Sequence, residues 1–216
     1  MNLVFLARQA SPAEGKAHQY LVAAESELSH VAQIARQTLA FYRDAGTPVA
    51  VDLHELIETV LTVYDSKLLA AGISIERQFD DLQKIVVSKR EMIQVFSNVI
   101  ANAIDAMKRG GALHLSTRMV TGSCGDGIQS IIRDEGSGID QKHLDKIYDP
   151  FFTTKGERGT GIGLWVTKQL VEKRGGLIAI ASSIDAGNSG TTVTIFLPFA
   201  SPATFPSRTG EAKIPM

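Results

Sequence analysis

The sequence has almost none of the features that tie a protein to an oxidising compartment or to a bilayer. Its one cysteine, Cys124, cannot form an internal disulfide, so nothing indicates secretion. No apolar run reaches the roughly 18 residues that a membrane span needs, and Met1 opens no signal-peptide pattern. We therefore expect a cytoplasmic chain that makes no membrane contact itself, with any membrane attachment lying in a longer parent.

An excess of positive charge is also missing. Lys and Arg number 22 against 23 Asp and Glu, so no field exists that would hold a nucleic-acid backbone. Apolar residues make up 44% of the 216 residues and charged residues 21%, a composition typical of soluble globular proteins. The length allows one core of ordinary size and a smaller second part.

The N-terminal part, residues 1–46, has the pattern of a helical hairpin. Leu3 to Arg8 is similar to the last turns of a helix, and Ser11 to Gly15 has a turn composition. Beyond it, apolar or small residues recur at alternating steps of three and four. They are Leu21, Ala24, Leu28, Val31, Ala35, Thr38 and Tyr42. This heptad seam predicts either a second copy as partner or packing on the chain's own domain, and the periodicity leaves both open.

Asp44 to Pro48 break the helical pattern, and we place a domain boundary there, with a main domain over residues 47–200. Short strands and long helices alternate in it, which predicts an α+β fold. The expected helices are Leu53 to Leu69, Glu91 to Lys108 and Gly161 to Lys173. The expected strands are Ile73 to Phe79, Ile85 to Val87, Leu113 to Met119, Gln129 to Arg133, Leu177 to Ser182 and Thr192 to Pro198. Residues 201–216 are expected to form a flexible tail.

Polar residues interrupt the expected helix from Glu91 to Lys108. Asn98, Asn102 and Asp105 share one face of it, and asparagine is a poor helix former. An amide oxygen can bind Mg²⁺, which prefers oxygen ligands and is often shared with nucleotide phosphates. The stripe alone also fits an ordinary solvated face.

Two glycine-rich segments follow. Asp134 to Gly138 comes directly after a strand, where a carboxylate can accept a hydrogen bond from the exocyclic amine of adenine. Gly159 to Leu164 leads into a helix, whose first N–H groups can bind phosphate. Between them Phe151 and Phe152 lie in a polar stretch typical of a lid, and Lys155 and Arg158 could reach phosphate oxygens.

In this order and spacing the segments resemble the boxes of the catalytic domain of sensor histidine kinases, in the GHKL superfamily. Asn98 to Met107 (NVIANAIDAM) is similar to the N box, Asp134 to Gly138 to the G1 box and Asp149 to Phe152 to the F box. Gly159 to Gly163 is similar to the G2 box, and Gly190 to Thr192 to the last glycine motif. The resemblance covers roughly residues 51 to 198.

The resemblance implies a Bergerat-type α/β sandwich, a mixed sheet with helices on one face, that binds ATP and Mg²⁺ under a flexible lid. It implies Asn102 as the Mg²⁺ ligand and Asp134 as the residue that reads adenine. The expected catalytic residues are Asn98, Asn102, Lys155 and Arg158. The expected nucleotide-binding residues are Asn102, Asp105, Asp134, Gly136, Gly138, Ile139, Phe152, Thr153, Gly159, Thr160, Gly161, Ile162, Gly163, Leu164 and Thr191. A homodimer through the hairpin and a response regulator partner are implied as well.

The phosphate-accepting histidine of that family is expected outside this chain. Residues 27–43 are similar to the second helix of the dimerisation domain, whereas the acceptor lies on the first. His30 lacks the neighbours of an acceptor. His54 begins an acceptor-like triplet and half of a zinc HExxH motif, but Glu58 stands where the second histidine would be. We therefore expect His54 to be a surface helix residue, and no autophosphorylation by this chain alone.

Relatives of the fold that hydrolyse ATP carry a Glu one turn before the metal-binding Asn. Asn98 occupies that place here and cannot take a proton, which favours phosphoryl transfer over hydrolysis. Two alternatives stay open: an anti-sigma-type serine kinase of the same fold, against which the hairpin argues, and a nucleotide-sensing dimerisation module without turnover.

Overall fold

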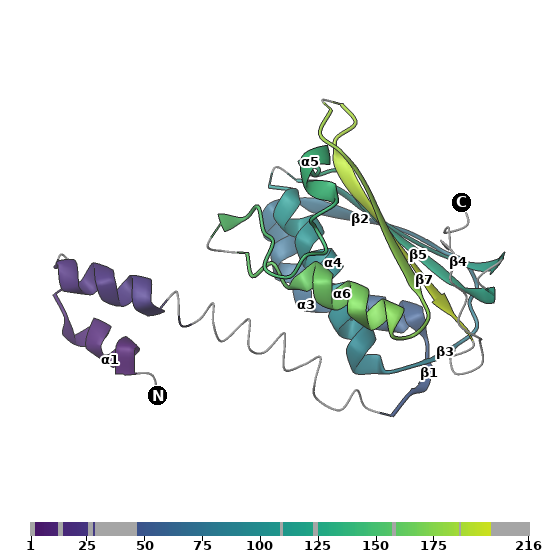
Figure 1. Cartoon of the computed structure of the whole chain (residues 1–216), viewed down its shortest axis with the longest axis horizontal. Coiled ribbons are helices and arrows are strands. Elements are labelled where there is room, and N and C mark those ends of the chain that lie inside the picture. Colours follow the sequence, from purple (N-terminus) through teal and green to yellow (C-terminus); the bar gives the residue numbers. More distant parts are fainter. Residues whose placement is uncertain are drawn as a thin grey trace.

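The computed structural model describes residues 3–12, 15–25, 28, 47–108, 110–122, 125–156, 159–185 and 187–199. They form a pair of N-terminal helices and an α/β sandwich (Figure 1). Helix α1 spans Leu3–Ala10, and residues 16–25 are also helical. Arg8 Nε lies 2.8 Å from Glu25 Oε2 and joins the two helices. The seam positions Val31 to Tyr42, His30 and the tail 201–216 lie outside the described residues, so the proposed domain bounds remain predictions.

One mixed five-stranded sheet forms a layer of the sandwich, in the order β2-β4-β5-β7-β6. Strand β2 is parallel to β4, and the other neighbours are antiparallel. The bounds are β2 Ile73–Phe79, β4 Gly111–Gly122, β5 Gly125–Asp134, β6 Leu177–Ser183 and β7 Gly190–Pro198. A separate antiparallel pair consists of β1 Val49–Val51 and β3 Ile85–Val87.

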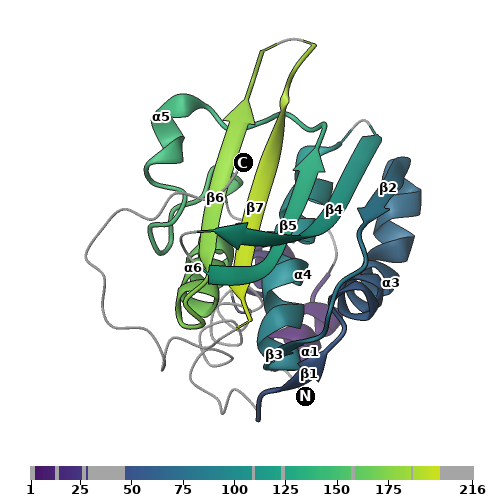
Figure 2. The ribbon, with the colours of Figure 1, turned by 90° about the vertical axis from the view of Figure 1, so that its right-hand side faces the viewer.

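Three long helices cover one face of this sheet, as Figures 1 and 2 show. They are α3 Leu53–Ala71, α4 Lys89–Ala106 and α6 Gly163–Glu172, and a short helix, α5, spans Gln141–Leu144. Asp52 begins α3 by accepting hydrogen bonds from the backbone N–H groups of His54 and Glu55, and Gly72 ends it in a left-handed conformation. None of the described helices is both long enough and apolar enough to cross a membrane.

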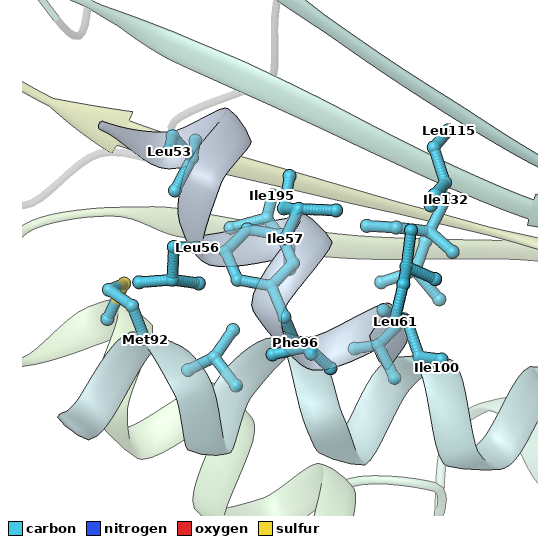
Figure 3. Packing of buried hydrophobic residues seen from close by; sticks show 14 of the residues in the cluster. Leu53, Leu56, Ile57, Leu61, Met92, Phe96, Ile100, Leu115, Ile132 and Ile195 are labelled. Atoms are coloured by element: carbon cyan, nitrogen blue, oxygen red, sulfur yellow. The ribbon is translucent and has the colours of Figure 1, made fainter. Parts of the chain in front are cut away.

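The core lies between α3, α4 and the inner face of the sheet. In Figure 3, Leu56 and Ile57 of α3 and Phe96 of α4 meet Ile132 and Ile195 of the sheet, all at most 2% exposed. Each such side chain stabilises the fold by about 1.5–3 kcal/mol relative to an exposed one. This packing fixes α4, and with it the expected N box, against the sheet.

The fold confirms the α+β sandwich, and it differs from the expected elements in detail. Strand β1 and helix α5 were not expected. Helix α6 begins at Gly163 rather than Gly161, because Gly161 has a φ of 64°, which an α-helix does not accommodate. His54 is half-buried rather than a surface residue. Its ring stacks on Phe79 at 4.5 Å, and its Nε2 lies 2.7 Å from the Thr117 hydroxyl.

Candidate nucleotide-binding site

The expected adenine reader, Asp134, is a buried carboxylate at the end of β5, in register with Leu113 of β4 and Thr191 of β7. Its Oδ1 accepts hydrogen bonds from the N–H groups of Gly136 (2.9 Å) and Thr191 (3.2 Å). Burial raises the pKa of Asp134, and these two N–H groups partly lower it again. Its Oδ2 has no donor among the described residues, so it can accept a hydrogen bond from a ligand.

The loop after Asp134 is fixed to elements on both sides. Ser137 N donates to the Ala106 carbonyl at the end of α4 (3.2 Å), and Ile139 N donates to Ser182 Oγ of β6 (2.8 Å). Gly138 has a φ of 69°, and a Cβ there would collide with the backbone carbonyl of Ser183. The glycines of this loop therefore serve close backbone approach as well as a turn.

On α4 the side chains of Asn102 and Asp105 lie together and face a cation. Lys155 Nζ, from the segment after the F box, is 2.7 Å from both Asn102 Oδ1 and Asp105 Oδ2. Asn102 is half-buried and Asp105 is exposed. Two oxygens that already attract an ammonium group also suit Mg²⁺, which is a hard cation with oxygen ligands. These residues therefore fit the expected metal.

Asn98 does not join this group of oxygens. It is 9% exposed, and its Nδ2 donates to the carbonyl of Gly163 (2.9 Å) and to Thr167 Oγ1 (3.2 Å), both on α6. Its Oδ1 accepts from Gln94 Nε2 at 2.8 Å. The sequence pattern put Asn98 on one stripe with Asn102 and Asp105, but the structure engages its amide with α6 instead.

The third expected element, Gly159 to Leu164, leads into the start of α6. Ile162 precedes the helix and gives it no side-chain cap, although Ile162 N itself donates to Thr160 Oγ1 at 3.4 Å. The N–H groups of Gly163 and Leu164, the first two of α6, thus receive no cap from the side chain of Ile162. Such N–H groups at the positive end of a helix dipole bind anions.

A backbone hydrogen bond joins the two ends of the lid segment. Phe151 N donates to the Gly161 carbonyl (3.0 Å), and both residues are in the left-handed region, with φ of 70° and 64°. Within the loop Thr153 Oγ1 accepts from Lys155 N (3.1 Å), and Gly159 packs against Thr153. Phe152 lies 5.6 Å from the His143 ring. Arg158 lies outside the described residues, so its role stays a prediction.

Three supporting residues escaped the sequence reasoning: Tyr148, Thr167 and Ser182. Ser182 Oγ donates to the Gly190 carbonyl (2.7 Å) and so joins the G1 loop to the last glycine motif. Tyr148 lies beneath Lys168 Nζ, 4.8 Å from its ring centre, and burial raises the pKa of its phenol to about 12. Tyr148 directly precedes the F box, but the partners of these three side chains lie on other elements, so only the fold reveals the contacts.

Comparison with known proteins agrees with this geometry. Residues 88–201 match a family described as "Histidine kinase-, DNA gyrase B-, and HSP90-like ATPase". The chain is 32% identical over 190 residues to the sensor histidine kinase ZraS of Escherichia coli K12, covering 87% of this chain and 39% of that protein. It is 32% identical over 151 residues to sporulation kinase C of Bacillus subtilis 168, covering 69% of this chain and 33% of the kinase. The chain thus spans well under half of these relatives.

Solved structures share the fold. The full-length ShkA structure with AMPPNP has a TM-score of 0.68 at 20% identity, covering 92% of this chain and 42% of ShkA. The complex of histidine kinase ThkA with the response regulator TrrA gives a TM-score of 0.69 at 20% identity, covering 94% of this chain and 57% of the kinase. The mycobacterial sensor histidine kinase MprB gives 0.61 at 24% identity, covering 71% of this chain and 99% of that one.

Proposed function

Because the chain belongs to the histidine kinase-, DNA gyrase B- and HSP90-like ATPase family, we propose that it is the Mg²⁺-ATP-binding catalytic portion of a sensor histidine kinase. It would transfer the γ-phosphoryl group of ATP to a histidine that this chain does not contain, for relay to a response regulator. What supports the proposal is that three groups lie on α4 or are hydrogen-bonded to it: the loop after the Asp134 carboxylate, the Asn102 and Asp105 oxygens, and the start of α6.

Each group has a distinct task in this proposal. Asp134 would accept a hydrogen bond from the adenine amine at Oδ2, where guanine would present a carbonyl oxygen and be repelled. The start of α6 would hold phosphate oxygens through backbone N–H groups. Asn102 would hold Mg²⁺, which would neutralise charge on the phosphates when bound. Lys155 would then exchange its contacts with Asn102 and Asp105 for phosphate oxygens, joined by Arg158.

Transfer rather than hydrolysis is favoured by the residue type one turn before Asn102, which is the amide Asn98 and not a carboxylate. The amide of Asn98 cannot accept a proton, so it cannot activate a water molecule as a carboxylate could. In phosphoryl transfer the protein mainly positions groups and stabilises charge, and the residues of this site are suited to both tasks. A response regulator partner is supported by the likeness to ThkA, whose structure contains one. Homodimerisation and a cytoplasmic location stay predictions.

A binding measurement followed by a transfer measurement tests the proposal. Trp165 lies at the start of α6, so its emission should change when ATP and Mg²⁺ are added and the lid moves. Radiolabel from ATP should then appear on an added complete dimerisation domain and not on this chain. Label on this chain alone would refute the missing acceptor. Binding with no transfer would favour the nucleotide-sensing module, and no binding at all would refute the proposal.

A further inference from the structure

Helices α4 and α6 carry different parts of the site, and a buried amide joins them. Asn98 of α4 donates from Nδ2 both to the carbonyl of Gly163, at 2.9 Å, and to Thr167 Oγ1, at 3.2 Å. The Thr167 hydroxyl itself donates to the same carbonyl at 2.8 Å. Three polar groups thus meet at the first turn of α6, next to the N–H groups proposed to bind phosphate.

The hydrogen bonds of Asn98 leave little capacity for a ligand. Both Nδ2 protons are used within the protein, and Oδ1 accepts from Gln94 at 2.8 Å. The side chain is 9% exposed. Breaking any of these bonds would leave a buried polar group unpaired, which is unfavourable. Asn98 is therefore poorly suited to bind the metal or to take part in proton transfer.

The far end of α6 is held to α4 in a second way. Glu91, 5% exposed near the start of α4, accepts from Lys173 Nζ at 2.8 Å and from Arg174 Nη2 at 3.2 Å, just beyond the end of α6. With Asn98 at one end and Glu91 at the other, α6 is fixed along α4. Sliding or rotation of α6 would have to break one of these contacts.

We propose that Asn98 is a positioning residue, which sets the phosphate-binding first turn of α6 relative to the Asn102 oxygen on α4. This inference rests on the proposed ATP binding and assigns separate roles in it to Asn98 and Asn102. Asn102 acts through the metal, whereas Asn98 acts through the backbone of Gly163 and Leu164. The adenine end, at Asp134 in the sheet, is independent of Asn98.

The roles separate in a series of ligands titrated against the whole chain by calorimetry. For Asn98→Ala we expect adenosine affinity within about twofold of the parent, and ADP and ATP affinity lower by about tenfold. The loss should be the same with Mg²⁺ and with EDTA. Asn102→Ala should lose ATP affinity only when Mg²⁺ is present.

A second pair of variants guards against unfolding of Asn98→Ala. Thr167→Val keeps the shape of the side chain, removes one acceptor of Asn98, and should show a smaller loss of the same kind. Thr59→Val is its control, since Thr59 makes a similar hydroxyl bond to the Glu55 carbonyl (2.7 Å) on the exposed face of α3 and should change nothing.

The alternatives give different patterns. A loss for Asn98→Ala or Thr167→Val that appears only with Mg²⁺ would assign Asn98 to the metal and overturn the inference. An equal loss for adenosine, ADP and ATP would show general damage and overturn it too. Absence of ATP binding by the parent chain would instead refute the proposed function, so the two failures are distinguishable.

Discussion

At Asp134, burial in the sheet raises the pKa of a carboxyl group that has to be ionised to accept the adenine amine. The folded chain therefore holds this proton more tightly than the unfolded chain. The resulting contribution to stability is complete below the unfolded value of 3.8 and is lost as the pH rises through the raised pKa. For Asp134→Asn, which cannot titrate, we expect stability relative to the parent to increase as the pH rises from about 3.5 to about 7.

Thermal unfolding of the two proteins across this pH range, without nucleotide, measures the difference in their stability. The contributions of the other carboxyl groups largely cancel in this difference. Glu135→Gln is the control, because its slope should have the opposite sign. The Ala112 N–H group and His114 lower the pKa of Glu135, so its contribution is present at higher pH and lost on acidification. A flat or falling difference for Asp134→Asn would contradict the prediction.

Glycines with the same backbone conformation differ in what surrounds them. Gly138 and Gly156 have φ of 69° and 58°, but only Gly138 lies against another strand, at the Ser183 carbonyl. Both Gly→Ala changes should cost about 1–2 kcal/mol in backbone strain. Gly138→Ala should also displace the G1 loop and lower the free energy of unfolding by more than about 3 kcal/mol in total. Urea unfolding tests this, and equal losses for the two variants would contradict it.

Among the elements, α4 and α6 depend on one buried carboxylate. Glu91 is 5% exposed and contacts Lys173 and Arg174, whereas Glu58 pairs with Arg77 at 44% and 42% side-chain exposure. For Glu91→Gln we expect a loss of about 1–3 kcal/mol, since a buried charge-assisted network is broken. The matched change Glu58→Gln should cost about 0–1 kcal/mol. Urea denaturation at low and high salt measures the loss of stability in both variants. Comparable losses would be evidence against a structural role for Glu91.

The helices and strands were largely predictable because their hydrophobic periods are clear. Strands β2 and β3 have the expected bounds, Ile73–Phe79 and Ile85–Val87. Gly72 ends helix α3 just before β2, and Ser88 caps the start of α4 just after β3. Strand β1 spans only Val49–Val51 and α5 only Gln141–Leu144, which are too short to show a period. Pairing with β3 and the Asp140 cap, respectively, define these two elements in the fold.

The candidate site was predictable where backbone chemistry leaves a mark in the sequence. Glycines and a carboxylate after a strand indicated the positions of Asp134 and Gly138. The partners of a side chain leave no such mark. Asn98 shares a helical stripe with Asn102 and Asp105, yet it lies one turn closer to the start of α4, where its amide meets Gly163 of α6. His54 likewise looked exposed by sequence, while Phe79 and Thr117 cover it from strands far along the chain.

For the whole molecule, the N-terminal helices carry apolar side chains that the described residues do not cover. Leu3 is 80% exposed, Tyr20 72% and Leu28 46%. If a second copy packs on the heptad seam, Leu28→Glu should weaken the dimer by at least about tenfold, because each buried leucine contributes about 1.5–3 kcal/mol. Sedimentation velocity at several concentrations measures this.

The control for the dimer is Val63→Glu on α3, where a 75% exposed side chain lies outside the seam. It should leave the dissociation constant unchanged. A parent chain that sediments as a monomer at every concentration would exclude dimerisation through these helices.

The hydrogen bond from Phe151 N to the Gly161 carbonyl joins the two ends of the lid loop. Since this bond is made by residues at the ends of the loop, doubling the number of residues between them should lower the stability by only about 0.6 kcal/mol in loop-closure entropy. A peptide epitope or a small reporter grafted after Gly156 would therefore be carried without disturbing the sandwich, and its environment would report each passage of nucleotide in and out.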